Sequence, residues 1–267
     1  MTEVDVLVPT RERPHALSVT LAGLAAQTVA ATRVVISDQS DRSVAGDPLV
    51  QSMVRVLRRH GTEVDLDHHR PLRGLAENRH HLLSRARSSH VLYLDDDVWL
   101  EPWALERLLT AIEELRCGFV GFAVQGLSYL ADHRPQEEAP FELWEGPVQP
   151  ERLRPHGPGW DRWTLHNAAN PTHLGDRLAL AEGDWRAYKV AWIGACVLYE
   201  RRALLDAGGF SFWDRVPADH SGEDVLVQLR VMEARGGAGI LPTGSVHLEL
   251  PTTVDRRSVE CYEQVGL

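Results

Sequence analysis

Residues 91–97 read Val-Leu-Tyr-Leu-Asp-Asp-Asp, an apolar run that closes on three consecutive carboxylates, Asp95, Asp96 and Asp97 (the acid triplet). A short apolar run between polar residues predicts a buried strand. Carboxylates at the mouth of such a strand need a cation, because burying an unpaired charge is costly. Oxygen ligands suit Mg²⁺ or Mn²⁺ rather than zinc, so the stretch indicates a divalent metal beside a diphosphate. The alternative interpretation is an acidic surface turn that begins a helix at Glu101.

Strand and helix patterns alternate four times through the first 115 residues. The expected strands are residues 4–8, 33–37, 64–68 and 91–94, and the expected helices are about 14–27, 50–57, 74–86 and 105–115. Such alternation is typical of an α/β fold with a mostly parallel central sheet and helices on both faces.

Polar side chains follow three of these strands directly. Pro9, Thr10 and Arg11 follow the first strand, Asp38 follows the second, and the acid triplet follows the fourth. Ligands of parallel sheets bind outside the carboxyl ends of the strands. We therefore expect a basic side chain, an acceptor carboxylate and a metal site to share one crevice.

Composition excludes several classes of protein. The 267 residues suffice for one large domain or two small ones, and 43% hydrophobic with 25% charged residues is typical of a globular protein. The net charge of −10 disfavours nucleic-acid binding through phosphates. Residues 1–5 lack the pattern of a signal peptide, and no apolar stretch is long enough to span a membrane. The three separated cysteines, Cys117, Cys196 and Cys261, indicate reduced thiols in a cytoplasmic protein.

Residues 126–188 have little periodicity and are rich in Pro, His, Trp and Gly. An irregular stretch this long is usually a functional loop, so we expect it to wall an acceptor pocket and to be partly mobile without ligand. Trp160 or Trp163 would offer an indole face to a sugar or another ring. The alternative is that these tryptophans fix the loop to the core.

Regular patterns return at residue 190. A strand is expected at 190–199, a helix at 201–207, a loop at 210–221, a helix from 222 and a last strand at 240–247, while the tail after 251 shows no pattern. Glu223 and Asp224 at a helix start have a simple explanation, since acids there favour the helix dipole. A lone histidine at a strand end, such as His247, is more often structural than a ligand.

Seven short elements, in this order along the chain, resemble the family 2 glycosyltransferases, which have the GT-A fold. They are Val-Pro-Thr-Arg at 8–11, Asp38, residues 74–79, Leu-Asp-Asp-Asp at 94–97, residues 194–199 with Gly208-Gly209-Phe210, Gly222-Glu223-Asp224, and His247. The resemblance spans about residues 4–247 and leaves 126–188 uncovered. It implies one GT-A domain over 1–267, with a Rossmann-like nucleotide-sugar-binding half at about 1–125 and an acceptor-binding half at about 126–267.

The resemblance also implies a donor site. Residues that would line the nucleotide pocket or contact the donor are Pro9, Thr10, Arg11, Asn78, Arg79, Asp95 and Asp96. Asp38 would accept a hydrogen bond from the base, usually uracil. The chain departs from the family at Glu77, where an arginine is frequent, and at Gln39, where a second aspartate is frequent. These departures leave the nucleotide and the donor sugar open.

A metal and a base are implied as well. Asp95 and Asp97 would form the D-x-D pair, and His247 resembles the third metal ligand of some members. Mn²⁺ would be preferred to Mg²⁺, because it tolerates imidazole better. Asp224 resembles the catalytic base. Acceptor contacts are expected from Trp160, Trp163, Trp213 and Glu223.

The implied function is metal-dependent, inverting transfer of a sugar from a nucleotide diphosphate, UDP first, to a hydroxyl group of a soluble acceptor. The acceptor would be a small metabolite, an oligosaccharide or a peptide. The metal stabilises charge on the leaving diphosphate, and a carboxylate accepts the proton of the attacking hydroxyl.

Three alternatives compete with this function. A haloacid-dehalogenase-like phosphatase would carry its Asp-x-Asp on the first strand and needs a lysine, for which Lys189 is the sole candidate. A nucleotidyltransferase would have a glycine-rich loop after the first strand, but residues 9–14 contain no glycine. A degenerate, non-catalytic protein of the same fold would bind a sugar nucleotide or a protein partner, and the presence of both Asp97 and Asp224 weakens that alternative.

Overall fold

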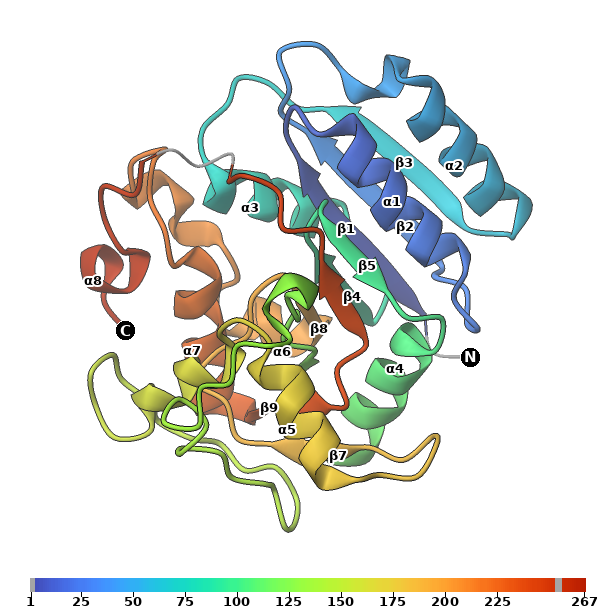
Figure 1. Ribbon diagram of the computed structural model, residues 1–267. Helices are drawn as coiled ribbons and strands as arrows, with labels where there is room; N and C mark the ends of the chain where they lie inside the picture. Colours follow the sequence, from blue (N-terminus) through green and yellow to red (C-terminus); the bar gives the residue numbers. More distant parts are fainter. Residues whose placement is uncertain (1–2, 253–255) are drawn as a thin grey trace.

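The computed structural model describes residues 3–252 and 256–267. Its centre is an eight-stranded sheet in the order β3-β2-β1-β4-β8-β6-β9-β7, beside a two-stranded sheet of β10 and β5 (Figure 1). The strands are β1 (Val4–Thr10), β2 (Arg33–Asp38), β3 (Glu63–His68), β4 (His90–Leu94), β5 (Val98–Leu100), β6 (Phe119–Gly121), β7 (Arg186–Tyr188), β8 (Cys196–Glu200), β9 (Gly237–Leu241) and β10 (Ser245–His247). The α-helices are α1 (Pro14–Ala25), α2 (Pro48–Arg59), α3 (Leu75–Arg85), α4 (Ala104–Leu115), α5 (Asn170–Leu178), α6 (Arg201–Asp206), α7 (Glu223–Arg235) and α8 (Cys261–Val265).

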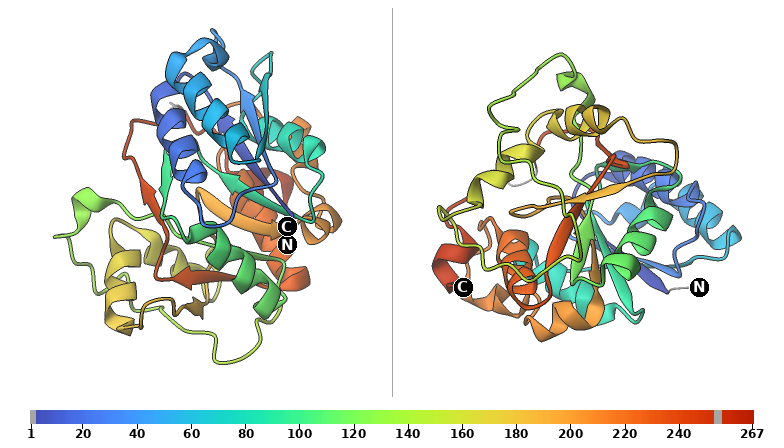
Figure 2. Two further views of the ribbon diagram at one scale, coloured as in Figure 1. Left: turned by 90° about the vertical axis from the view of Figure 1, so that its right-hand side faces the viewer. Right: turned by 90° about the horizontal axis from the view of Figure 1, so that it is seen from below.

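The four N-terminal strands are parallel, as the sequence predicts. β1 lies between β2 and β4, and β3 pairs with β2. Val6 and Leu92 pack with α1, α2 and α4 on one face, while Leu7 and Tyr93 pack with α3, α6 and α7 on the other. Figure 2 shows α1 and α2 on one side of these strands and α3 on the other. Burial on both faces explains why β1, β2 and β4 are mostly apolar, whereas the edge strand β3 alternates polar and apolar residues.

Strand β8 joins this half to the rest of the sheet. It runs antiparallel to both β4 and β6, and Cys196 lies opposite Leu94. The backbone N–H of Asp95 donates to the carbonyl of Ala195 at 2.9 Å. The acid triplet is therefore anchored at the point where the parallel strands meet the antiparallel ones.

The expected strand at 190–199 is wrong in its first half, because residues 190–195 form a loop. The side-chain amide of Gln228 satisfies both backbone groups of Ile193. The Ile193 N–H donates to Gln228 Oε1 at 2.8 Å, and Gln228 Nε2 donates to the Ile193 carbonyl at 2.7 Å. Because a side chain replaces the ladder bonds here, this largely buried apolar run needs no neighbouring strand.

The expected strand at 240–247 is divided in two. β9 ends at Leu241, and β10 begins at Ser245 and pairs antiparallel with β5. Between them, the hydroxyl group of Thr243 donates to the carbonyl of Ala123 at 2.7 Å. This division places His247 opposite Val98, one residue after the acid triplet.

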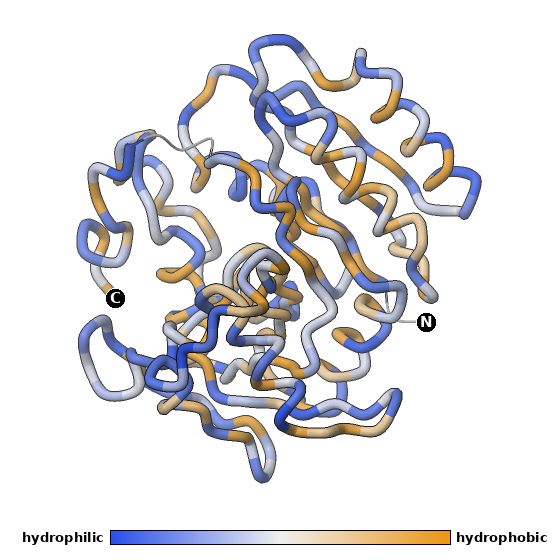
Figure 3. The backbone as a smooth tube through the Cα atoms, in the orientation of Figure 1, coloured by the Kyte–Doolittle hydropathy of each residue, from blue (hydrophilic) through white to orange (hydrophobic). Residues whose placement is uncertain are grey.

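The irregular segment 126–188 contains α5, β7 and 3₁₀ turns at Leu127–Tyr129 and Trp160–His166. It packs along α7, where Glu151 N–H donates to the Met232 carbonyl at 3.2 Å and Arg154 pairs with Glu233 at 2.8 Å. In Figure 3 its long loops are mostly hydrophilic, at the lower edge of the molecule. Among the described helices, none has both the length and the apolar character needed to cross a bilayer.

Candidate active site

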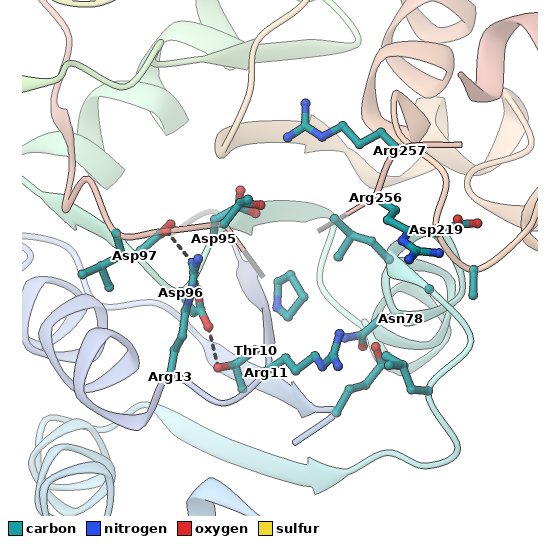
Figure 4. Close-up of a pocket in the computed structure, with 18 of the residues that line it drawn as sticks. Thr10, Arg11, Arg13, Asn78, Asp95, Asp96, Asp97, Asp219, Arg256 and Arg257 are labelled. Carbon is teal, nitrogen blue, oxygen red and sulfur yellow. Dashed lines mark hydrogen bonds and ion pairs between the residues drawn. The ribbon is translucent and has the colours of Figure 1, made fainter. Parts of the chain in front are cut away.

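A cavity of about 710 Å³ lies at the carboxyl ends of β1, β2 and β4 (Figure 4). Its lining residues are Pro9, Thr10, Arg11, Arg13, Gln39, Leu72, Gly74, Leu75, Asn78, Asp95, Asp96, Asp97, Ala218, Asp219, His247, Leu250, Thr252, Arg256 and Arg257. The volume is within the usual range for small-molecule sites. The structure thus brings together most of the predicted donor and metal residues, but Asp38, Arg79 and Asp224 do not line the cavity.

The middle carboxylate of the acid triplet holds the site together. Asp96 is buried, and its Oδ2 accepts the hydroxyl group of Thr10 at 2.6 Å. Its backbone carbonyl accepts the hydroxyl group of Thr20 at 2.9 Å. Burial raises the pKa of Asp96 to about 6, although the bond from Thr10 opposes this shift. Asp96 therefore fixes the end of β1 against the triplet.

Asp97 is neutralised by an arginine that was not predicted for the site. Arg13 Nη1 lies 2.6 Å from Asp97 Oδ2 and 3.4 Å from Asp96 Oδ1. Arg13 also donates to the carbonyl of Pro251. It stands next to Pro14, at the start of α1, and its neighbourhood gives no sequence signal for a role at a carboxylate cluster.

Asp95 belongs to a second charge network behind the cavity. Its Oδ1 lies 3.3 Å from Nη2 of the buried Arg79, and Nε of Arg79 lies 3.3 Å from Oε1 of the buried Glu223. Burial and the neighbouring Asp97 and Asp224 raise the pKa of Asp95, while Arg79 lowers it. Arg79 is thus a buried cation shared between two carboxylates.

The donor set of Asp95, Asp97 and His247 matches Mn²⁺ in ligand type. Their ligand atoms do not all lie within 4.8 Å of one another. His247 Nε2 lies 3.6 Å from Asp97 Oδ2, and its Nδ1 accepts the backbone N–H of Glu249 at 2.9 Å. A neutral ring that accepts at Nδ1 carries its proton on Nε2. The two carboxylates fit a divalent cation. Nε2 of His247 can bind that cation only after its proton moves to Nδ1, which breaks the hydrogen bond from the Glu249 N–H.

Asp224 lies at the start of α7, where its Oδ1 accepts the N–H of Val225 at 2.8 Å. The sequence predicts that the helix start favours the ionised carboxylate. Burial is the larger effect, the charge of Glu223 adds to it and Arg79 opposes it, and together they raise the pKa of Asp224 to about 6. A carboxyl group with this pKa is still mostly ionised at pH 7.

Asp38 points into its own loop. The carboxylate is fully buried, where it accepts the N–H of Ser40 at 2.9 Å and the N–H of Val44 at 2.8 Å. The residue that reaches the cavity after β2 is Gln39. Asp38 therefore shapes the loop that presents Gln39.

The predicted acceptor residues are spread outside the cavity. Trp160 packs edge-on against Tyr262 of α8, with ring centroids 5.9 Å apart, while Trp163 is 40% exposed. Trp213 lies near Arg73, whose guanidinium carbon is 5.8 Å from its ring centroid. Glu223 is committed to Arg79. None of these four residues lines the cavity, and neither does any residue of 126–188.

Helix α3 begins against the loop that carries Asp219. Nε2 of the buried His220 accepts the N–H of Ala76 at 3.0 Å, and its Nδ1 lies 2.6 Å from the carbonyl of Pro217. Gly74 has φ of +99°, and a Cβ there would lie 2.7 Å from the carbonyl oxygen of Ala218. The loop and the helix thus close one wall of the cavity.

The same wall also carries positive charge, beside Asp219, that the sequence analysis did not assign (Figure 4). Arg256 and Arg257 come from the tail after Pro251 and lie across the cavity from Asp96 and Asp97 (Figure 4). Two adjacent arginines were the sequence feature that could have indicated an anion-binding role. The tail has no periodicity, so the sequence did not show that they reach the cavity.

A family model described as "Glycosyl transferase family 2" matches residues 5–183. The chain belongs to this family. The match covers more than half of the sequence and includes the acid triplet. Membership of this family removes the phosphatase and nucleotidyltransferase alternatives. No curated protein sequence matches the chain.

Solved glycosyltransferase structures share its GT-A fold. S. aureus TarS 1-349 in complex with UDP-GlcNAc is 16% identical, with a TM-score of 0.58 over 95% of this chain and 60% of that chain. The mannosyltransferase PcManGT from Pyrobaculum calidifontis in complex with GDP-Man and Mn²⁺ is 15% identical, with a TM-score of 0.56 over 94% of this chain and 58% of that chain. For S. aureus TarS itself, the TM-score is 0.54 at 16% identity, over 89% of this chain and 35% of that chain. The family 2 chain therefore spans about a third to three fifths of the length of these structures.

Proposed function

We propose that the protein is a metal-dependent, inverting glycosyltransferase that uses a nucleotide-diphosphate sugar. The observation that carries this proposal is the charge arrangement of the cavity, with the acid triplet on one wall and Arg256 and Arg257 on the other. A diphosphate bridged to a divalent cation carries charges of both signs and complements both walls.

The donor roles follow from position. Asp95 and Asp97 would hold the cation, with Mn²⁺ first and Mg²⁺ second, and the arginines would contact the phosphates. The nucleoside would lie toward Pro9, Gln39 and Asn78, at the ends of β1, β2 and the start of α3. When bound, the cation would neutralise the charge that develops on the leaving diphosphate.

Asp224 is proposed as the general base. Its pKa of about 6 keeps it ionised at neutral pH and able to accept the proton of an acceptor hydroxyl. A single displacement from the face opposite the diphosphate would invert the anomeric configuration. His247 would join the cation after its Nδ1 releases Glu249.

The proposed donor is a UDP-sugar. TarS 1-349 was solved with UDP-GlcNAc and PcManGT with GDP-Man, so both nucleotides should be assayed.

The acceptor is proposed to be soluble and to approach from the side of segment 126–188. There the hydroxyl group of Ser128 donates to Glu249 Oε1 at 2.6 Å, two residues from His247. Trp160, Trp163, Trp213 and Glu223 are proposed as more distant acceptor contacts. A cytoplasmic location is proposed from the three buried, free cysteines.

Release of UDP or GDP, measured with Mn²⁺ and pools of candidate acceptors, tests the proposal. We expect Asp224→Asn to lower transfer by about 10²–10⁴-fold with donor affinity nearly unchanged, as for loss of a general base. Asp97→Asn should instead weaken metal and donor binding together. Transfer by Asp224→Asn at the wild-type rate would remove Asp224 from the mechanism.

A non-catalytic, sugar-nucleotide-binding protein is the second candidate. The ion pair of Arg13 with Asp97 favours it, since this arginine occupies a carboxylate that the metal needs. Binding of UDP-sugars without nucleotide release in any acceptor pool would support this candidate.

A further inference from the structure

A second cluster of metal-type ligands lies where β3 meets α3. Asp67 lies near the end of β3, and His69 follows the last residue of that strand. Glu77 and His81 are four residues apart on α3, so they share one face of the helix. None of these four residues lines the donor cavity.

The side chains converge closely. One ligand atom each of Asp67, His69 and His81 can be chosen so that all three lie within 4.8 Å of one another, and these residues form the one such group among the described residues. His81 Nε2 lies 2.8 Å from Asp67 Oδ2. His69 Nε2 lies 2.8 Å from Glu77 Oε1. The side chains of the three ligands are 19–34% exposed, so an ion from solvent can reach them.

The two imidazoles stack face to face, with centroids 3.8 Å apart and ring planes 7° apart. Two protonated imidazoles would repel each other in this arrangement, whereas two neutral rings can donate from Nε2 to Asp67 and Glu77 and keep a lone pair on Nδ1 for a metal ion. Arg85 supplies some positive charge, because its Nη1 lies 3.7 Å from Asp67 Oδ2. Two neutral imidazoles beside a carboxylate are a ligand set that a dication would satisfy.

We propose that Asp67, His69 and His81 bind a borderline transition-metal ion of the Zn²⁺ class. Two nitrogen ligands and one oxygen ligand distinguish this site from the oxygen-rich acid triplet, because imidazole suits Zn²⁺, Co²⁺ and Ni²⁺. Three protein ligands leave a fourth tetrahedral position for water. Glu77 is a positioning residue that holds the His69 ring.

The site is connected to the donor cavity through Glu77. Glu77 Oε2 lies 3.3 Å from Nε2 of Gln39, which lines the cavity, and Asn78 beside it lines the cavity as well. An ion at this site would tie the end of β3 to α3 and so hold the loop after β2. Its role is therefore structural support of the donor site, separate from the chemistry of sugar transfer.

Titration of the tag-free, metal-free protein with Co²⁺ tests the site. Co²⁺ replaces Zn²⁺ in such sites and absorbs visible light when tetrahedrally bound. We expect one equivalent to give visible bands that Zn²⁺ abolishes by displacement. His69→Gln and His81→Gln should lose the bands, and Glu77→Gln should weaken binding about 10–100-fold, as for an outer-shell partner.

Two matched controls should keep the bands. His15→Gln removes a histidine whose side chain is 81% exposed, and Asp97→Asn disables the donor site. Failure of Co²⁺ to give bands in the wild type, or bands that persist in His81→Gln, would overturn the proposal. Zn²⁺ should also raise the melting temperature of the wild type, because it binds the native state. If the histidine variants do not fold, Asp67→Asn is used in their place, and Zn²⁺ should not raise the melting temperature of that variant.

Discussion

Asp224 is surrounded by charges of both signs, which gives it a testable pH dependence. Burial, together with the charge of Glu223 and against the charge of Arg79, raises its pKa to about 6. Because a base must be ionised, kcat/KM for transfer should rise with pH through about 6 and then level off. Glu223→Gln removes a negative neighbour, so it should lower the pKa and move this acid limb to lower pH. The dependence of kcat/KM on pH, measured for the wild type and for Glu223→Gln, tests this prediction. If the acid limb lies at the same pH in both proteins, the limb does not report the ionisation of Asp224.

Arg13 occupies the position of a cation at Asp97. The guanidinium donates at 2.6 Å, so a bound metal must compete with it. Arg13→Gln should therefore lower stability without metal but bind Mn²⁺ about tenfold more tightly, if the lost bond is worth about 1.5 kcal/mol. Mn²⁺ titrations followed by calorimetry measure the change, with a substitution of the exposed Arg59 of α2, Arg59→Gln, as control. Weaker Mn²⁺ binding in Arg13→Gln would mean that Arg13 supports the metal site.

Individual residues of the site were predictable only where strand ends determine them. Pro9 and Thr10 end β1, the acid triplet follows β4, and all of them reach the cavity, as the parallel pattern predicts. Asp38 also lies at a strand end, yet its carboxylate accepts two backbone N–H groups of its own loop and does not reach the cavity. Arg256 arrives from far along the chain, and local pattern carries no information about such a contact.

Secondary structure shows the same division between strong and weak signals. The first four strands have five to seven residues and the helices that follow them have eleven or twelve, so their sequence patterns are long enough to recognise. β5, β6 and β7 have three residues each, too few for a period to show. The run 190–195 resembles a strand because it is apolar, but the amide of Gln228 supplies the hydrogen bonds that a strand would need.

The junction of α3 with the 217–220 loop depends on a glycine. A Cβ at Gly74 would lie 2.7 Å from the Ala218 carbonyl oxygen and 2.9 Å from His220 Cε1, at φ of +99°. Gly74→Ala should lower the free energy of unfolding by about 1–3 kcal/mol, because backbone strain and displacement of the 217–220 loop both destabilise the native state. The displaced loop should also weaken UDP binding.

Gly61→Ala is the matched control for this variant. Gly61 has φ of +92°, but a Cβ there would meet no atom within 4 Å, so the substitution adds strain without a clash. Thermal melts and UDP titrations of both variants separate the two effects. Equal loss of UDP affinity in both would contradict a role for the junction.

The whole molecule joins a regular half to an irregular one across β8. The donor cavity lies mainly on the regular half, whose topology the sequence predicts, and Arg256 and Arg257 close it from the C-terminal tail. Segment 126–188 lacks a repeated pattern and packs through individual contacts such as that of Trp160 with Tyr262. The structure of this segment could therefore not be predicted from the sequence.

Binding of UDP to the native state should stabilise this whole molecule only when a divalent metal is present. The acid triplet and a diphosphate repel each other unless a cation bridges them. With Mn²⁺ and UDP at about 100 times its Kd, the stabilisation should be about 2.7 kcal/mol, which corresponds to a rise in Tm of about 5–10 °C for a chain of this size. Thermal melts with UDP, with Mn²⁺, with both, and with both plus EDTA measure this. Asp97→Asn should abolish the joint effect, and an equal rise with UDP in EDTA would mean that the arginines bind the diphosphate without a metal.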